Sequence, residues 1–331
     1  MSKERLHWVD VSKGILILLL LLHHFSSAKR VLGIDGEYFT FITCWQQLYT
    51  AFFMQAFMIM SGYCSNFNKS SQQFWMGVIK QLVIPFIFFQ FVICCISSME
   101  KSDFTLNGIF SIGYLLGGTN LWFLNALIVS KIIIYYMRKV FHNIYTIFIF
   151  TLLLLLIAHT LDYFDLGTNF LCIRQSLGSV FFVYFGCMLR EKEGLFSKCS
   201  LLGYIYPYVL LMLLFFKLPI PASTANMASL ILVPLFVPLS ISGSMAFFTL
   251  CKKINSSAFL EYFGRNSLIV YGVHFKLLCV SIILTLQIIN VNNFLMGIIA
   301  SIIIYTTMVL ACTFIIELFE RVPMKWLVGR F

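Results

Sequence analysis

The chain has 331 residues, of which 60% are hydrophobic and only 11% are charged, and its formal net charge is +10. Soluble domains carry about 25% charged residues, so the composition excludes an ordinary soluble protein and indicates an integral membrane protein. The sequence lacks the alternating apolar and polar pattern of an outer-membrane barrel. It therefore predicts an all-α membrane protein.

Apolar runs of roughly 20 residues, the length that crosses a bilayer as a helix, recur along the whole chain. We predict a bundle of about ten transmembrane helices, at residues 11–27, 43–64, 76–97, 119–138, 143–161, 170–189, 201–218, 227–250, 264–287 and 293–318. No polar stretch separates soluble domains, so residues 1–331 are expected to form a single transmembrane domain.

The first run also has features of a cleaved signal peptide. Lys3 and Arg5 precede it, and the residues FSSA at its end resemble a weak cleavage site. Against this interpretation, Asp10 and Lys13 stand at its entrance and two adjacent histidines near its far end. These polar residues favour a first helix that is retained in the membrane.

Lysine and arginine are distributed unevenly over the connecting loops. If successive loops alternate sides from a cytoplasmic N-terminus, roughly 15 basic residues lie inside and roughly 5 outside. This bias predicts that both termini of the multi-pass protein are cytoplasmic. We expect the membrane to be the bacterial cytoplasmic (inner) membrane. Because topology then explains most of the net charge, membrane lipid is an expected partner and nucleic acid is not.

The cysteines give no sign of a metal centre. The chain has 10 of them, mostly inside the apolar runs and without CxxC spacing. In such a setting Cys behaves as a small hydrophobic residue, so neither a metal site nor a disulfide framework is expected.

The first run, VDVSKGILILLLLLHHF, carries ionisable residues that a simple anchor does not need. On a helix, His24 lies about 20° around the axis from Lys13 and about 40° from Asp10, so these three residues share one face. His23 is turned by about 100° and is expected to pack or snorkel elsewhere. Lys13 and His24 are roughly 16 Å apart along the axis, so a ligand that touches both must be long. Coenzyme A has such a shape.

The other polar residues divide by their predicted depth. Those near the inner face are Asp10, Lys13, Ser61, Lys80 and Arg265. Those deeper, or toward the outer side, are His24, Trp122, Asn125, Arg174, Tyr271 and His274. This division predicts that an anionic group docks inside and that chemistry takes place further into the membrane.

Most of these residues also have a purely structural interpretation. Asp10 favours the helix dipole, and inner Lys or Arg residues serve the positive-inside rule. The pair Ser61–Gly62 is more typical of close helix packing than of a nucleophile, and Trp122 fits an interfacial belt as well as a sugar platform. The remaining histidines lie near the ends of runs and are expected in the membrane interface: His7, His142 and His159.

The stretch WVDVSKGILILLLLLHH resembles the opening signature of the membrane-bound acyltransferase 3 family, D-x-x-R/K-G with a His fourteen residues after the Asp. The match falls on Asp10, Lys13, Gly14 and His24. It continues in order with MIMSGYC, Lys80 to Pro85, LWFL, FFVYFGCML and FGRNSLIVYGVHF. Lys13, where many members carry Arg, resembles the branch related to fucose 4-O-acetylases; a Lys acts there as a point charge, not as a bidentate donor.

The resemblance implies O-acetylation of a cell-surface glycan or lipid-linked sugar from cytoplasmic acetyl-CoA, without a metal. His24 is then the general base that removes the proton of the acceptor hydroxyl, supported by Asp10 and His274. The residues expected at the donor are Lys13, Lys80, Arg265 and Ser61, and those expected at the acceptor are Trp122, Asn125, Arg174 and Tyr271. The protein would complete the transfer itself or hand the acetyl group to a glycan-assembly partner.

Two other classes fit the composition. In a glycolipid transporter or flippase, His24 and Lys13 would line a translocation path, and acetyl-CoA would be ignored. In a non-catalytic assembly subunit, changes to the polar residues would leave activity unaffected as long as the bundle folds.

Overall fold

The computed structural model describes residues 6–31, 45–100, 121–164, 166, 170–192, 194, 200–215, 233–254, 256–321 and 325–329. These residues form helices, turns and short connections and contain no strand, as the all-α prediction requires. Each predicted apolar run coincides with at least one helix.

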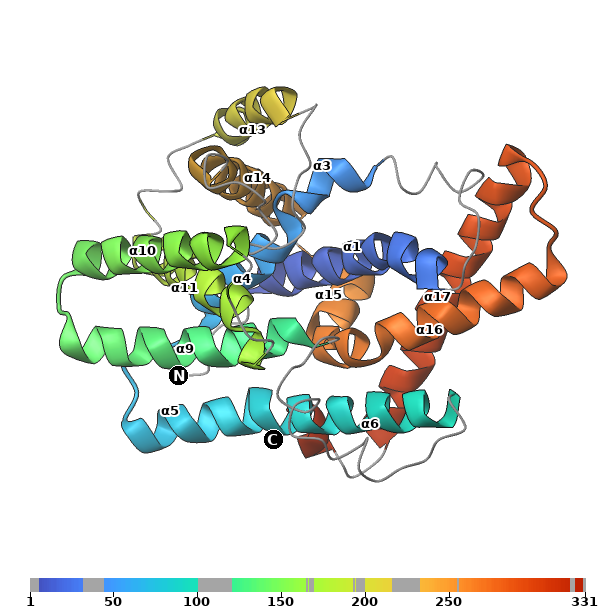
Figure 1. Cartoon of the computed structure of the whole chain (residues 1–331), viewed down its shortest axis with the longest axis horizontal. Coiled ribbons are helices and arrows are strands. Elements are labelled where there is room, and N and C mark those ends of the chain that lie inside the picture. The colour runs from blue at the N-terminus through green and yellow to red at the C-terminus, as the bar shows by residue number, and fades with distance from the viewer. Residues whose placement is uncertain are drawn as a thin grey trace. The chain divides into compact units, whose positions relative to one another are not determined.

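The chain forms two compact units, each assembled from separate stretches of sequence. Figure 1 labels most of their helices. Unit 1 comprises Met1–Phe53 and Cys251–Lys325, and unit 2 comprises Met54–Leu250 and Trp326–Phe331. The helices of unit 1 are α1 (His7–Val31), α3 (Gln46–Thr50), α15 (Ala258–Arg265), α16 (Ser267–Ile288) and α17 (Phe294–Arg321). Those lying wholly or mostly in unit 2 are α4 (Phe53–Cys64), α5 (Ser71–Val78), α6 (Ile84–Glu100), α9 (Trp122–Val140), α10 (Ile144–Tyr163), α11 (Ile173–Glu191), α13 (Leu201–Phe215) and α14 (Val233–Ile254). Short turns of other helix types are η2 (Ile79–Val83), η3 (Phe170–Cys172) and η5 (Lys325–Val328).

Several helices are suited to a bilayer by length and composition. Six stretches among the described residues are long and apolar enough to cross it: His7–Phe25, Ser71–Ile96, Ile144–Asp162, Pro234–Ile254, Ser267–Ile288 and Phe294–Arg321. Shorter apolar helices cover Leu48–Cys64 and Leu201–Leu213. The protein is thus a multi-pass membrane protein, while the total of ten spans and the side on which the termini lie stay predictions.

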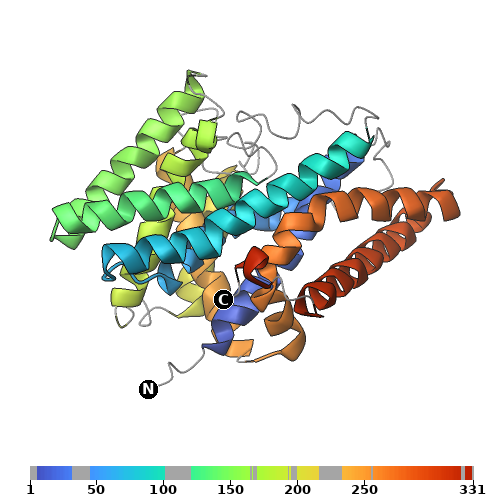
Figure 2. The ribbon, with the colours of Figure 1, turned by 90° about the horizontal axis from the view of Figure 1, so that it is seen from below.

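In unit 1, α1 and α15 cross at a reciprocal pair of glycines. A Cβ on Gly14 would overlap with the backbone carbonyl of Leu260, and a Cβ on Gly264 would overlap with that of Asp10. Small residues permit this backbone contact between membrane helices. The helix α16 packs against α1 and forms a hairpin with α17 (Figure 2).

In unit 2, α11 packs against α9 and α10. A second glycine pair joins α11 to α4, because a Cβ on Gly62 would overlap with the carbonyl of Val183 and one on Gly186 with that of Ile59. The sequence-based interpretation of the Ser61–Gly62 step as a close packing point is therefore confirmed for Gly62. The glycines of four sequence motifs thus form two helix crossings.

A π-helical turn, η2, connects α5 to α6 in unit 2 and carries Lys80. Pro85 lies just beyond it and has no N–H to donate to the carbonyl of Gln81, so the regular helical pattern is interrupted there. The amide of Ile84 instead donates to the carbonyl of Ile79, five residues back. Such π turns occur frequently at functional sites.

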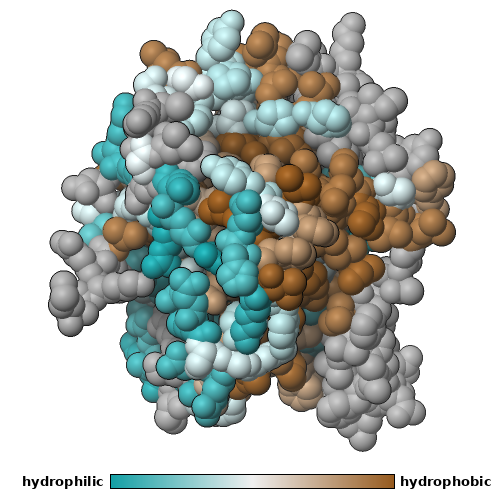
Figure 3. Space-filling model, turned by 90° about the vertical axis from the view of Figure 1, so that its left-hand side faces the viewer, coloured by the Kyte–Doolittle hydropathy of each residue, from teal (hydrophilic) through white to brown (hydrophobic). Residues whose placement is uncertain are grey.

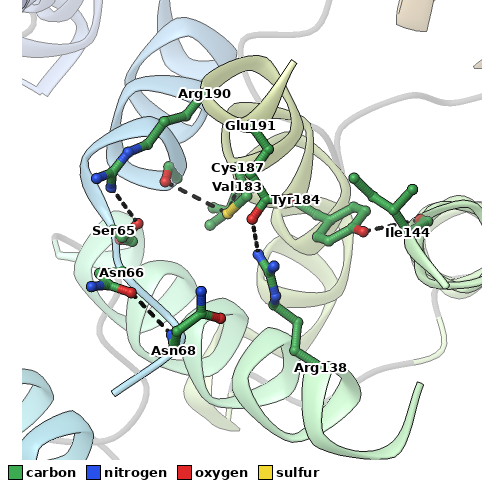
Figure 4. A network of polar contacts seen from close by, with 11 residues as sticks. Ser65, Asn66, Asn68, Arg138, Ile144, Val183, Tyr184, Cys187, Arg190 and Glu191 are labelled. Atoms are coloured by element: carbon green, nitrogen blue, oxygen red, sulfur yellow. Dashed lines mark hydrogen bonds and ion pairs between the residues drawn. The ribbon is translucent and has the colours of Figure 1, made fainter. Parts of the chain in front are cut away.

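One end of unit 2 is polar, with exposed side chains in the α4–α5 and α9–α10 connections, namely Asn66, Asn68, Lys69, Ser70, His142 and Asn143 (Figure 3). Ion pairs and hydrogen bonds join the helix ends beside it (Figure 4). Arg138 of α9 lies 2.6 Å from the carboxylate of Glu191 of α11, and Arg190 donates to the carbonyl of Ser65 at 3.0 Å. These contacts hold the ends of α4, α9 and α11 together.

Candidate active site

The centre of the candidate site is a pair of histidines in unit 1. The ring of His24 on α1 and the ring of His274 on α16 have centroids 4.8 Å apart. His274 is buried and His24 is half-buried. The packing of α16 along α1 brings them together, so the structure unites two of the three residues predicted to be catalytic.

The tautomer of His274 follows from its backbone contact. Its Nδ1 lies 2.7 Å from the carbonyl oxygen of Tyr271. A carbonyl only accepts hydrogen bonds, so Nδ1 carries the hydrogen and Nε2 presents a lone pair. Within the described residues, this buried Nε2 has no hydrogen-bond partner.

The Nδ1 atom of His24 is in the same state, buried and without a hydrogen-bond partner in the described part of the chain. Leaving a buried polar atom unsatisfied costs about 1–3 kcal/mol. Two such atoms on adjacent rings therefore favour a ligand that exchanges hydrogen bonds with them, such as a hydroxyl group.

Aromatic rings enclose the histidine pair. The ring of Tyr271 stacks on that of His274 with centroids 5.6 Å apart, and the ring of Phe275 lies 5.8 Å from that of His24. Tyr271, predicted to contact the acceptor, therefore contributes its carbonyl and its ring to the placement of His274.

His23 has different neighbours from His24, as the helical wheel predicts. Its ring lies 4.9 Å from that of Phe53 and 6.4 Å from that of Tyr49. The two adjacent imidazoles are themselves 5.7 Å apart and nearly perpendicular. His24 is therefore the histidine of this pair that meets His274.

Three of the residues predicted at the inner face gather at the crossing of α1 and α15. The backbone of Asp10 contacts Gly264, the residue before Arg265. Lys13 lies one turn further along α1 and is half-buried. Among the described residues, Lys13 forms no ion pair or hydrogen bond. An unpaired, half-buried cation is suited to a phosphate ligand.

A buried acid at this crossing escaped the sequence analysis. Glu261 of α15 accepts a hydrogen bond from His7 Nδ1 at 3.1 Å. This hydrogen bond lowers the pKa of the Glu261 carboxyl below its usual value, against the opposing effect of burial. The available signal was the spacing of Glu261 and Arg265, which are four residues apart and therefore neighbours on a helix.

Unit 2 holds two further residues predicted near the inner face. Lys80 is half-buried in the π turn η2. Ser61 is half-buried beside Gly62, and its backbone carbonyl accepts a hydrogen bond from Ser65 Oγ at 2.7 Å. Both positions fit structural roles as well as a ligand.

The three remaining residues predicted at the acceptor also lie in unit 2, near the starts of α9 and α11. Trp122 is half-buried at the start of α9, with its ring edge-on to that of Phe123. Asn125 is buried and shares a side-chain hydrogen bond with Cys172.

Arg174 pairs with an acid of the neighbouring helix. Its Nη1 donates to Asp162 Oδ1 at 3.2 Å, which joins the start of α11 to the end of α10. Arg174 therefore has a positioning role in the structure, separate from the acceptor contact predicted for it.

The histidines expected in the membrane interface differ in their exposure. The side chain of His159 is fully buried, whereas His7 and His142 are exposed. Their depth in the membrane stays a prediction. Among the described residues, no group of three or more His, Cys, Asp or Glu side chains is placed to hold a metal ion.

Comparison with known proteins gives one match. The Acyl_transf_3 family model, described as an acyltransferase domain, matches residues 6–318. No curated protein and no solved structure matches the chain. The matched region contains His24, His274, the cations at the α1–α15 crossing and all four crossing glycines. The chain therefore belongs to the Acyl_transf_3 family of acyltransferases.

Proposed function

We propose that the protein is a membrane O-acetyltransferase of the bacterial cytoplasmic membrane, related to the fucose 4-O-acetylase branch. It transfers an acetyl group from cytoplasmic acetyl-CoA to a hydroxyl of a cell-surface glycan or lipid-linked sugar. Membership of the acyltransferase family supports the reaction class. The observation that carries the choice of site is the pair of buried, unsatisfied nitrogens on His24 and His274.

His24 is the general base in this proposal. The acceptor hydroxyl donates to the His24 ring, and its oxygen attacks the thioester carbonyl while His24 takes the proton. When the tetrahedral intermediate collapses, the carbon–sulfur bond breaks and protonated His24 returns the proton to the CoA thiolate. The step is balanced, with an O-acetyl ester and free CoA as its products.

His274 supports the base. Because the carbonyl of Tyr271 holds its Nδ1 hydrogen, its Nε2 accepts a hydrogen bond from protonated His24 or from the acceptor hydroxyl. A hydrogen bond to a charged group is worth about 1.5–3 kcal/mol. His274 thereby stabilises the charge that develops on His24 in the transition state.

The donor enters from the cytoplasmic side in this proposal. Lys13 offers an uncompensated charge to the CoA phosphates, with Arg265 at the same helix crossing and Lys80 and Ser61 as further expected contacts. The extended pantetheine arm covers the roughly 16 Å from Lys13 to His24 along α1. Trp122, Asn125 and Arg174 stay proposals for the acceptor side, as does a glycan-assembly partner.

The test is thioester consumption by the purified protein, with a glycolipid extract or water as acceptor. Removing a general base lowers the rate about 10²–10⁴-fold, so His24→Ala should lose turnover to that extent. His142→Ala is the matched control, because His142 is exposed and lies outside the site. Normal turnover by a folded His24→Ala variant contradicts the assigned base. If wild type neither binds nor consumes acetyl-CoA, the transporter interpretation gains the support instead.

A further inference from the structure

A second group of unsatisfied polar atoms lies in unit 1, next to the histidine pair. The hydroxyl of Tyr49 and Nδ1 of His23 are both buried and have no hydrogen-bond partner among the described residues. Tyr49 as a whole is only 8% exposed. The mechanism proposed above uses neither side chain.

Hydrogen bonds from side chains to backbone carbonyls tie the segments of Tyr49 and His23 together. Gln46, in the same short helix as Tyr49, donates its side-chain amide to the carbonyls of Leu22 at 3.0 Å and His23 at 3.2 Å. Thr50 Oγ1 in turn donates to the carbonyl of Gln46. The helix α3 is thus tied to α1, and the ring of Tyr49 lies edge-on beside that of His23.

The three aromatic side chains of this group pack against one another. The ring of Phe53 lies 4.9 Å from that of His23 and 5.7 Å from that of Tyr49, and the rings of His23 and Tyr49 are 6.4 Å apart. Phe53 is only 1% exposed, so it orients the other two rings, and the Tyr49 hydroxyl and the His23 ring nitrogen supply the polar contacts for a ligand.

The chemistry of the group selects a class of ligand. Neither Tyr nor neutral His carries a fixed charge, so the group offers no counterion to a phosphate or a carboxylate. A Tyr hydroxyl both donates and accepts, and a His nitrogen does one or the other according to its tautomer. A ligand hydroxyl also does both, so it matches either atom. A neutral polyhydroxylated ring has several such hydroxyls and apolar faces besides.

We propose that Tyr49, His23 and Phe53 form the subsite that binds a neutral pyranose ring of the acceptor. The ring of His23 lies 5.7 Å from that of His24, so a sugar held by this subsite would present a further hydroxyl to the base. As an account of the acceptor, the proposal rests on the transferase function; as a sugar-binding site, it can be tested without it.

The experiment measures sugar binding in the absence of acetyl-CoA. Purified protein is placed in lipid nanodiscs, because maltoside detergents would compete, and is titrated calorimetrically with a panel of p-nitrophenyl pyranosides. We expect Tyr49→Phe to raise the Kd for a bound pyranoside about 10-fold, equivalent to about 1.4 kcal/mol of lost binding free energy. His23→Gln should raise it similarly. Tyr145→Phe, which removes an exposed hydroxyl on α10, should leave it unchanged.

Equal affinity of wild type, Tyr49→Phe and His23→Gln for the pyranoside overturns the proposal. So does the failure of wild type to bind any pyranoside of the panel, which would make the ligand class wrong. Size-exclusion profiles and thermal unfolding show whether each variant is folded, and the second variant keeps the test decisive when the first fails to fold.

The rate of acetyl-CoA hydrolysis by water separates this proposal from the proposed function. Hydrolysis of acetyl-CoA by the wild-type protein tests the transferase alone, since water does not need the sugar subsite. Tyr49-dependent sugar binding by a protein that does not consume acetyl-CoA would refute the transferase and keep the subsite. If the protein consumes acetyl-CoA but binds the sugar equally well with and without the Tyr49 hydroxyl, the transferase is supported and the subsite is refuted.

Discussion

His24 and His274 show how single residues acquire a chemical role from their surroundings. The sequence marks both as unusual, because imidazoles are costly within a membrane helix. The carbonyl of Tyr271 then decides which nitrogen of His274 carries its hydrogen. That contact could not be assigned from sequence, since the ring might equally have bonded to a neighbouring helix.

The role of His274 predicts a specific kinetic signature. His274→Ala should lower kcat roughly 10- to 100-fold, because it removes a hydrogen bond worth about 1.5–3 kcal/mol to a charged transition state. The KM for acetyl-CoA should stay unchanged, since we propose that the donor phosphates bind at Lys13 and not at His274. The control is Thr285→Val, which removes a buried hydroxyl of α16 that donates to the carbonyl of Ser281 in its own helix. A rise in KM at constant kcat would show that His274 binds the donor.

Glu261 predicts a pH dependence of stability. Its folded-state pKa is lowered by the hydrogen bond from His7, so the contact stabilises the protein above the unfolded pKa of about 4.3. This contribution is lost as the pH falls below that value, through the lower folded-state pKa. The melting temperature of the wild type should therefore fall more between pH 6 and pH 3 than that of Glu261→Gln. Parallel pH profiles for the two proteins would show that the contact contributes nothing.

At the scale of elements, four motif glycines act as crossing points of helices. Gly14 and Gly264 join α1 to α15, and Gly62 and Gly186 join α4 to α11. Sequence analysis recognised the small-residue step at Gly62 but placed no partner opposite it. Each crossing depends on two backbones that are distant in sequence, which no local pattern encodes.

The crossings predict where a single methyl group is not tolerated. Gly14→Ala should destabilise the protein by about 1–3 kcal/mol, the usual cost of overpacking, because the Leu260 carbonyl cannot retreat without moving α15. Gly77→Ala is the control, since a Cβ there meets nothing within 4 Å; it should be neutral or slightly stabilising, as Ala is the better helix former. Thermal unfolding in detergent measures both. Equal melting temperatures for the two variants would show that the α1–α15 crossing does not limit the size of the side chain at position 14.

At the scale of the whole molecule, helices from both ends of the chain build unit 1, while the middle of the chain builds most of unit 2. The predicted apolar runs coincide with helices, because hydropathy is read locally and each span needs only its own residues. Which runs meet is decided by packing between them. His24 and His274 share a unit for this reason, whereas Lys80, Trp122 and Arg174 belong to the other unit.

The distribution of Lys and Arg predicts the topology of the whole chain. A reporter enzyme that is active only outside the cytoplasm should be inactive when fused after residue 192, in the predicted inner loop between α11 and α13. The same reporter fused after residue 164, in the predicted outer loop after α10, should be active. Activity in the opposite pattern would invert the orientation and place Lys13 on the outer side.

The sequence by itself determined that this protein is a helical membrane protein, and it singled out the face of the first helix that carries His24. These conclusions follow from hydropathy and helical periodicity, which depend on neighbouring residues alone, whereas the acyltransferase signature rests on the resemblance of ordered motifs to a family. Only the tertiary structure decided that His274 faces His24, that Tyr49 and Phe53 face His23, and that His159 is buried. Such pairings arise where helices from different parts of the chain come into contact, and no local pattern in the sequence encodes them.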